Sequence, residues 1–373
     1  MKTPNFIFLM IDWLLTLYNL LGNFQTMIPL NKQKLEIPYN DNNTLNTRGK
    51  ELFSSGAEIL KSGKKLGVVI LSGGEGTRLG LSYPKGLFKI EGLTLFEWHL
   101  KRLEALYEKY GAQIYLFIMT SESTDSQVRE FFTSKTFNYL QGVDIFKQNS
   151  IEALDMNTKQ PLMKDGSKIM NPMGNGDFFE AIKKAKNMDQ VEAFNVISVD
   201  NVLANILDEV YVGTFFTRKM DVLSKAVKAL KNESVGAFMM DGKTIKIQEY
   251  SESKNKDHTD VYGNICNHMF SLEFVKLVGT KQLKLHEAFK KIPYTDSKGK
   301  LIKPTTPNGI KREKFIFDSF EFAKNNGILV VNRNVEFSPL KNSLESASDN
   351  QSTCTEAVKK SRIFKKGKTV PAN

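Results

Sequence analysis

A glycine-rich stretch carries the first residues of this chain that could do chemistry. Residues 68–86 read VVILSGGEGTRLGLSYPKG. Glycines at the C-terminal end of a strand let backbone N–H groups approach a phosphate without a Cβ in the way. Arg78 and Lys85 add positive charge at the same place. The spacing matches neither GxxxxGK[ST] nor GxGxxG, because Leu79 stands where the third glycine should be, so the stretch predicts a phosphate loop of another kind.

A second candidate is the pair Asp200-Asn201, which follows the apolar residues 194–199. An aspartate at the end of a buried strand is a frequent way to hold a divalent cation opposite a phosphate. A structural aspartate that caps the next turn explains the same residues equally well. A second glycine turn at 174–176 and Lys341 in the sequence SPLKN favour the cation, because they add further phosphate-binding groups.

The sequence lacks the familiar motifs of nucleophilic and zinc-dependent catalysis. It contains no HExxH and no GxSxG, and its four histidines and two cysteines form no triad or metal-ligand pattern. Two cysteines give no disulfide framework, which favours a reducing compartment, the cytoplasm. The feasible chemistry is phosphoryl or nucleotidyl transfer, in which cations and backbone N–H groups position the phosphates.

Alternating strands and helices must position these residues. Short apolar runs predict buried strands at 68–71, 114–119, 143–146 and 194–199, with helices between them. This order is typical of an α/β fold, a doubly wound and mostly parallel sheet with helices on both faces. A hairpin with a DG turn at 235–250 predicts a small antiparallel subregion. Ligands bind such sheets at the carboxyl ends of strands, where Gln148 and Asp200 are expected.

Composition divides the chain into three parts. Residues 1–46 are an N-terminal extension and linker, 47–342 the catalytic domain, and 343–373 a basic, weakly structured tail. Residues 6–21 are strongly apolar. An amphipathic helix, or sequence upstream of a start at Met27, explains them better than a membrane anchor.

The charge of the chain favours anionic partners. The net charge is +11 over 373 residues. No basic-aromatic module for nucleic acid is present. Nucleotides are therefore the expected anions, and neither nucleic acid nor a membrane is an expected partner.

Several motifs resemble, in order, those of the eukaryotic-type UDP-sugar pyrophosphorylases, most closely the UDP-N-acetylglucosamine pyrophosphorylases. The first is LSGGEGTRLGLSYPKG, which resembles their LxGGxGTRLGxxxPKG. The others are GNG at 174–176, VDN at 199–201, QEYSE at 248–252, GNICNH at 263–268, KPTTPNGIKREKFIFD at 303–318 and EFSPLKN at 336–342. The resemblance runs from about residue 47 to 342. It implies a Rossmann-like nucleotide-diphospho-sugar transferase fold.

The resemblance implies a magnesium-dependent uridylyl transfer. UTP and N-acetylglucosamine 1-phosphate would give UDP-N-acetylglucosamine, for chitin or glycan synthesis, and pyrophosphate. The sugar phosphate oxygen would attack the α-phosphorus of UTP in line. This oxygen is already anionic, so no general base is needed.

Roles follow from positions in the family motifs. Arg78 and Lys85 would neutralise the triphosphate, Lys341 would grip the sugar phosphate, and Asp200 would hold Mg²⁺. The nucleotide-binding residues implied are Gly73, Gly74, Gly76, Thr77, Gln148 and Gly174. The sugar-binding residues implied are Asn175, Glu249, Asn264, Phe315 and Phe317. From the residues alone, the two phenylalanines could equally pack in the core.

The chain departs from the family pattern at three places. Glu75 stands where glutamine is frequent, and Tyr262 stands where alanine is usual, next to Asn264. The chain also ends soon after Lys341, without the small C-terminal domain of the family, so a monomer is expected. A preference for N-acetylgalactosamine 1-phosphate or glucose 1-phosphate stays open, as does a catalytically silent UDP-sugar-binding regulatory protein.

Overall fold

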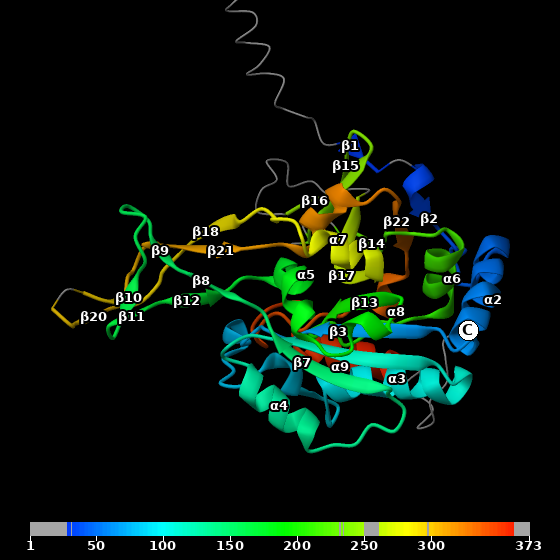
Figure 1. Cartoon of the computed structure of the whole chain (residues 1–373), viewed down its shortest axis with the longest axis horizontal. Coiled ribbons are helices and arrows are strands. Elements are labelled where there is room, and N and C mark those ends of the chain that lie inside the picture. The colour runs from blue at the N-terminus through cyan, green and yellow to red at the C-terminus, as the bar shows by residue number, and fades with distance from the viewer. Residues whose placement is uncertain are drawn as a thin grey trace, which may run out of the picture.

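A large twisted sheet forms the centre of the molecule in this computed structural model, which describes residues 28–30, 32–230, 233, 235–249, 261–296 and 298–361 (Figure 1). The sheet has 11 strands in the described chain. Its main path runs in the order β2 (Leu35–Glu36), β22 (Asn326–Val330), β14 (Val222–Lys228), β17 (Tyr262–Ser271), β13 (Ala193–Ser198), β3 (Lys65–Leu71), β6 (Gln113–Thr120) and β7 (Gly142–Lys147). A branch contains β1 (Ile28–Pro29), β15 (Ala237–Asp241) and β16 (Thr244–Gln248).

Most pairs along the main path are parallel. Strand β3 pairs in parallel with β13 and β6, and β6 pairs in parallel with β7. Strands β14, β22 and β2 are also mutually parallel, whereas β17 runs antiparallel to β13 and β14. The β15–β16 hairpin turns at Gly242, whose φ is +61°. The mostly parallel sheet with a small antiparallel subregion confirms the predicted fold class.

Helices cover both faces of the sheet, so β3 is apolar on both sides. Val68 and Ile70 face one core and Val69 and Leu71 face the other, because alternate side chains of a strand point to opposite faces. The first face is covered by α2 (Thr47–Lys61), α3 (Leu95–Tyr110), α4 (Asp125–Thr133), α6 (Glu209–Thr217) and α9 (Gln351–Lys360). The second face is covered by α5 (Phe178–Ala181), α7 (Leu272–Val278) and the 3-10 helix η7 (Ile316–Phe322).

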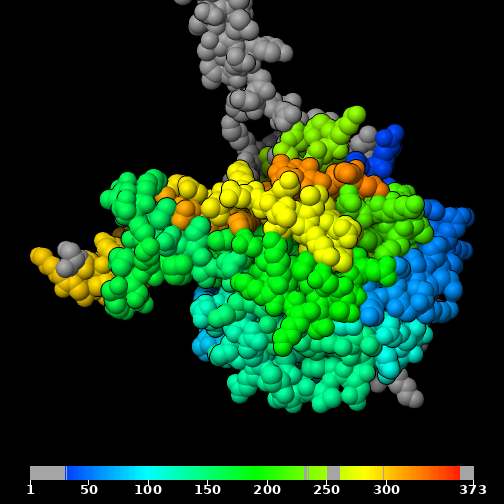
Figure 2. All heavy atoms as spheres, viewed as in Figure 1, coloured from blue at the N-terminus to red at the C-terminus, as the bar shows by residue number. Residues whose placement is uncertain are grey.

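An arm of short antiparallel strands projects from one side of the molecule (Figures 1 and 2). It joins two segments far apart in sequence. Their strands are β8 (Ser150–Glu152), β9 (Leu154–Asp155), β10 (Met163–Lys164), β11 (Ser167–Lys168), β12 (Met170–Pro172), β18 (His286–Lys290), β19 (Tyr294–Thr295), β20 (Leu301–Ile302) and β21 (Gly309–Glu313). The strands between 150 and 172 are only two or three residues long, so they leave no periodicity by which the sequence could indicate them.

Two helical segments contain 3-10 geometry. The short helix α5 is followed by the 3-10 helix η5 (Ile182–Lys184). The segment η7 is a 3-10 helix throughout. The other short elements are η1 (Lys32–Lys34), η2 (Thr77–Leu79), η3 (Lys85–Leu87), η4 (Asn175–Asp177), η6 (Met188–Gln190), α8 (Arg333–Glu336), β4 (Lys89–Ile90) and β5 (Leu93–Thr94).

Helix α9 lies in the tail that the sequence predicted to be weakly structured, and that prediction was wrong for these residues. The Asn350 side chain accepts from Thr353 N (3.0 Å) and Thr353 Oγ1 accepts from Asn350 N (3.0 Å), which caps the helix start. Cys354 and Val358 are fully buried in the first core. A polar, lysine-rich composition hid two apolar positions four residues apart on one helix face.

No helix in the described part of the chain is long and apolar enough to cross a membrane. The apolar residues 6–21 lie outside the described residues.

Candidate active site

The glycine loop follows β3 and is held by the loop after β6. Ser121 Oγ donates to Gly73 O (2.9 Å), and Thr124 Oγ1 donates to Ser72 O (3.0 Å). Gly76 and Gly80 have φ angles of +69° and +67°, in the left-handed region that favours glycine. A Cβ built on Gly74 meets no atom within 4 Å. The loop therefore presents open backbone at the carboxyl end of the central strand.

Gln148 follows β7 and joins the two glycine turns. Its side chain is nearly buried, and its Oε1 accepts from Gly174 N (3.0 Å). On the other side, a Cβ on Gly73 would stand only 2.1 Å from Gln148 Nε2. Three predicted nucleotide-binding residues, far apart in sequence, thus lie in direct contact.

The second glycine turn packs backbone against backbone on the chain leading into η7. Gly174 has a φ of +93°, and a Cβ on it would lie 2.6 Å from Lys314 O. Gly176 N donates to Lys314 O (2.9 Å), and Asn175 Oδ1 accepts from Ile316 N (2.9 Å). The structure therefore gives Asn175 an anchoring role for η7, in addition to any contact with a sugar.

Asp200 follows β13 and faces a cation from the glycine stretch. Lys85 Nζ lies 3.5 Å from Asp200 Oδ2, and Ser198 Oγ donates to Asp200 Oδ1 (2.7 Å). No cluster of three His, Cys, Asp or Glu side chains suited to a metal exists among the described residues. One carboxylate nevertheless fits Mg²⁺, because this ion is usually held by one or two carboxylates, with phosphates and water as the other ligands.

Helix α3 holds the segment around Asp200 through two hydrogen bonds to its main chain. Arg102 Nη2 donates to Val202 O (2.6 Å), and His99 Nε2 donates to Val199 O (3.1 Å). Burial lowers the pKa of His99 to about 3, so this imidazole is neutral. The neutral His99 imidazole therefore helps to hold the main chain next to Asp200.

Lys341 reaches the site because its loop is hydrogen-bonded to the loop of Asp200. Leu340 N donates to Asp200 O (2.9 Å), and Ser338 N donates to Asn201 Oδ1 (2.9 Å). Lys341 itself is half-buried, with Nζ 5.7 Å from the centre of the Phe337 ring. Its main chain is also fixed, because Lys341 N donates to Asp349 O (2.7 Å).

Cys266 in β17 lies near several of the predicted charged residues. Burial raises the pKa of its thiol to about 12; the charges of Asp200 and Glu249 raise it further, and that of Lys341 lowers it. Cys266 has a φ of +51° beside a bulge in β17, and Asn264 Oδ1 accepts from its N–H (2.9 Å). The charges of Asp200, Glu249 and Lys341 thus all act on the same part of β17, next to Asn264.

The two predicted aromatic residues differ in position. Phe315 and Phe317 stack with ring centres 5.0 Å apart. Phe317 is buried in the second core, whereas Phe315 is half-buried and lies 4.6 Å from the His286 ring. Phe315 also touches the second glycine turn, since a Cβ on Gly176 would meet its carbonyl at 2.7 Å.

Three residues of the glycine stretch face outward. Thr77, Arg78 and Glu75 are exposed, and no described side chain pairs with the Arg78 guanidinium. The structure thus brings Arg78 to the loop but not into contact with Asp200 or Lys341.

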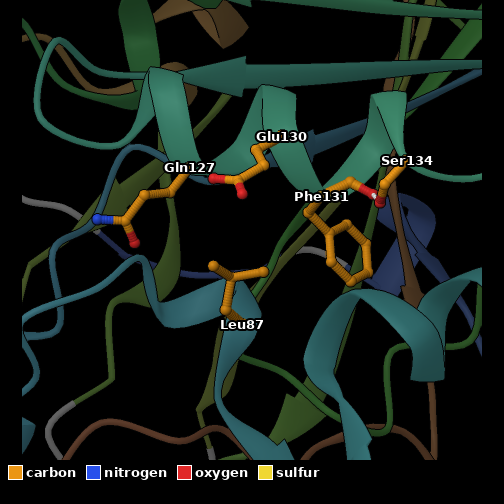
Figure 3. Close-up of a pocket in the computed structure, with 5 residues that line it drawn as sticks. All are labelled: Leu87, Gln127, Glu130, Phe131 and Ser134. Carbon is orange, nitrogen blue, oxygen red and sulfur yellow. Dashed lines mark hydrogen bonds between the residues drawn. The ribbon is translucent and has the colours of Figure 1, made fainter.

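A separate hollow of about 440 Å³ lies between α4 and η3. Figure 3 shows its lining residues, Leu87, Gln127, Glu130, Phe131 and Ser134. None belongs to the predicted site, so this hollow is not the candidate active site.

Sequence reasoning missed the residues that support this site. Ser198 donates a hydrogen bond that orients the Asp200 carboxylate. Asp177 Oδ2 accepts from the N–H of Asn149 (2.6 Å), the residue directly after Gln148. Burial raises the pKa of Asp177, and Lys314 Nζ lies 3.7 Å from its Oδ1. Ser198 stands two residues before Asp200, a spacing that could have indicated it. Lys314 lies within the motif at 303–318, but no role followed from its position there, and Asp177 carried no such signal.

A family model described as UTP–glucose-1-phosphate uridylyltransferase matches residues 22–370. The chain belongs to this family. A probable UDP-N-acetylglucosamine pyrophosphorylase of Encephalitozoon cuniculi is 50% identical over 336 residues, covering 90% of this chain and 98% of the relative. This similarity confirms the resemblance to UDP-N-acetylglucosamine pyrophosphorylases.

A longer relative and a solved structure agree with this family. The human UDP-N-acetylhexosamine pyrophosphorylase-like protein 1 is 37% identical, and the match covers 79% of this chain but 64% of the relative. The crystal structure of a UDP-N-acetylglucosamine pyrophosphorylase from Entamoeba histolytica superposes with a TM-score of 0.76 at 28% identity, covering 89% of this chain and 87% of that one.

Proposed function

We propose that this chain is a uridylyltransferase that converts UTP and N-acetylglucosamine 1-phosphate to UDP-N-acetylglucosamine and pyrophosphate. The observation that carries the proposal is the convergence of Lys85, Asp200 and Lys341, from three separate segments, beside an open glycine loop. The names of the relatives support the choice of nucleotide and sugar.

The chain's own groups are suited to transfer by positioning and charge. The Gly74 backbone is open to the nucleotide, and Gln148 and Gly174 lie where a uracil edge would be read. Because Gly174 N already donates to Gln148 Oε1, the Gln148 amide would read the base through its Nε2 donor and the second lone pair of Oε1. Lys85 neutralises the phosphates that leave as pyrophosphate. Lys341 orients the sugar phosphate for in-line attack, and Glu249 and Asn264 face the sugar.

Asp200 would hold Mg²⁺. The ion would neutralise charge on the triphosphate as pyrophosphate departs. Lys85 Nζ lies 3.5 Å from the same carboxylate, so the proposed metal ligand and a phosphate-binding cation stand side by side. Arg78, Thr77, Gly73, Gly76 and Asn175 complete the proposed nucleotide and sugar contacts.

A substrate panel tests the proposal. Pyrophosphate release would be measured for UTP and other nucleoside triphosphates, each with N-acetylglucosamine, N-acetylgalactosamine and glucose 1-phosphates. The expected result is highest kcat/KM for UTP with the N-acetylglucosamine substrate. A higher kcat/KM with another sugar 1-phosphate would mean that this other sugar is the preferred substrate. If no pair of substrates released pyrophosphate, the chain would instead be a catalytically silent UDP-sugar-binding protein.

We also propose that the chain acts as a cytoplasmic monomer. Light scattering would then give a mass near 42.3 kDa.

A further inference from the structure

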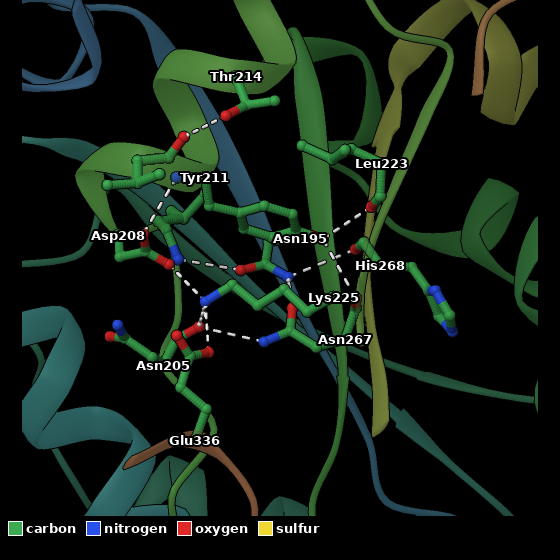
Figure 4. Close-up of polar contacts among 12 residues, drawn as sticks. Asn195, Asn205, Asp208, Tyr211, Thr214, Leu223, Lys225, Asn267, His268 and Glu336 are labelled. Atoms are coloured by element: carbon green, nitrogen blue, oxygen red, sulfur yellow. Dashed lines mark hydrogen bonds and ion pairs between the residues drawn. The ribbon is translucent and has the colours of Figure 1, made fainter. Parts of the chain in front are cut away.

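Figure 4 shows a buried ion cluster that joins β14 to the segments after β13 and at the end of α8. Lys225 of β14 is completely buried, and its Nζ pairs with the carboxylates of Asp208 and Glu336, the latter at 2.6 Å. Lys225 Nζ donates its third hydrogen bond to Asn205 O (3.1 Å). A lysine ammonium has three donors, so this one is fully satisfied without any substrate.

The cluster joins two loops that carry site residues. Asp208 and Asn205 belong to the segment that begins at Asp200, and Glu336 is the last residue of α8, directly before the loop that carries Lys341. One ammonium on a central strand therefore contacts both loops at once.

Hydrogen bonds also join the two segments close to Asp200 and Lys341. Asn201 Nδ2 donates to Glu336 O (2.8 Å), and Asn201 Oδ1 accepts from Ser338 N (2.9 Å). Val202 N donates to Ser338 O (3.2 Å) in the same ladder. The spacing between the Asp200 and Lys341 main chains is therefore fixed by directional bonds that begin at Glu336.

A contribution to stability alone does not explain why these charged side chains are buried. Removing two carboxylates and an ammonium from water is costly, and apolar residues of the same volume often stabilise a core as well or better. Leu340 already anchors the second loop by burial, but apolar burial is non-directional. Ion pairs and hydrogen bonds specify direction as well as proximity.

We propose that Lys225 and Glu336 are positioning residues that hold the Asp200 and Lys341 loops in register for the transfer. This inference rests on the proposed function. Neither residue touches substrate; each acts through the loops it fixes. A displacement of about 1 Å between reacting groups can lower a rate about 100-fold, so loosening this cluster affects turnover more than binding.

Lys225→Met and Glu336→Gln test the inference. We expect each to lower kcat at least tenfold, with the KM for UTP changed less than threefold, because the glycine loop and Gln148 are outside the cluster. Glu336→Gln keeps the side-chain shape and decides the question alone if Lys225→Met fails to fold. An unchanged kcat in folded Glu336→Gln would overturn the inference.

Glu209→Gln is the matched control. Glu209 directly follows Asp208 in the chain, but its buried carboxylate accepts from Lys109 Nζ (2.8 Å) and Tyr110 of α3 and contacts neither Lys225 nor the Lys341 loop. Loss of the Glu209 charge in this variant should lower the melting temperature, while kcat stays within twofold of the unsubstituted protein. An equal loss of kcat in this control would mean that any buried charge loss impairs turnover, and would overturn the positioning role.

A double-mutant cycle with Lys341→Ala gives a readout that general destabilisation does not move. If Glu336 acts through Lys341, the Lys341→Ala substitution should lower kcat much less in the Glu336→Gln background than alone. Equal fold-losses in both backgrounds would overturn the inference. An inactive unsubstituted protein would instead contradict the proposed function.

Discussion

Lys85 and Asp200 form a charged pair at the candidate active site. Lys85 comes from the glycine stretch and Asp200 from the end of β13, and their charged atoms lie 3.5 Å apart. Both side chains are largely buried, each with 16% exposure, so their charges are screened less than those of a surface pair. Substrate phosphates would meet groups that are already oriented.

Lys85→Ala should lower kcat about 100-fold, ~2.7 kcal/mol in the barrier, because the charge next to the leaving phosphates is lost. The measurement is steady-state pyrophosphate release. Lys89→Ala is the control, since Lys89 is an exposed lysine four residues later. Comparable kcat values for the two variants would exclude Lys85 from the mechanism.

Gly74→Ala separates nucleotide binding from folding. The Cβ meets no protein atom within 4 Å, so the melting temperature should not change. If UTP approaches this backbone, the methyl group should raise the Kd at least about tenfold, ~1.4 kcal/mol.

Titration calorimetry with UTP measures the effect of Gly74→Ala on binding. Gly73→Ala is the contrasting variant, because its Cβ would stand 2.1 Å from Gln148 Nε2 and should lower the melting temperature. Full UTP affinity in Gly74→Ala would place the nucleotide elsewhere.

At the scale of elements, sequence patterns predicted strands better than the contacts between them. The run at 68–71 lies within β3, and 194–199 overlaps β13, because buried parallel strands are continuously apolar. Gln148, Gly73 and Gly174 were each predicted, but their mutual contact depends on how three loops fold together. The arm and α9 were missed because their order comes from long-range pairing and packing.

Helices α2 and α6 show a packing constraint that no sequence motif indicated. A Cβ on Gly213 would lie 2.0 Å from Leu52 O, and one on Gly56 would lie 1.7 Å from Glu209 O. The helices therefore touch backbone to backbone, which only glycine allows.

Gly213→Ala should lower the free energy of unfolding by about 1–3 kcal/mol, because the helices must move apart. Denaturant titration measures this loss. Ser54→Ala, at an exposed position of α2, should change it by less than about 0.5 kcal/mol. Equal stability of the two variants would show that the helices tolerate a wider spacing, while kcat should stay unchanged in both.

At the scale of the whole molecule, one sheet collects site residues from most of the chain. Lys85, Asp200 and Lys341 are more than a hundred residues apart, yet β3, β13 and the loop after α8 bring them together. The charge excess predicted anionic ligands only in general. The sheet order, which composition does not encode, determines where those ligands would bind.

Truncation tests which part of the chain suffices for this arrangement. The described members of both cores and every predicted site residue lie within residues 28–361, so a protein of those residues should keep kcat within about twofold of the full chain.

A protein of residues 28–342 ends where the sequence placed the catalytic domain boundary and lacks α9. It loses the burial of Cys354 and Val358, about 3–6 kcal/mol. It also loses the bond from Lys341 N to Asp349 O, so both unfolding free energy and kcat should fall. Equal stability and turnover of the two truncated proteins would show that α9 is dispensable and that the domain ends at 342.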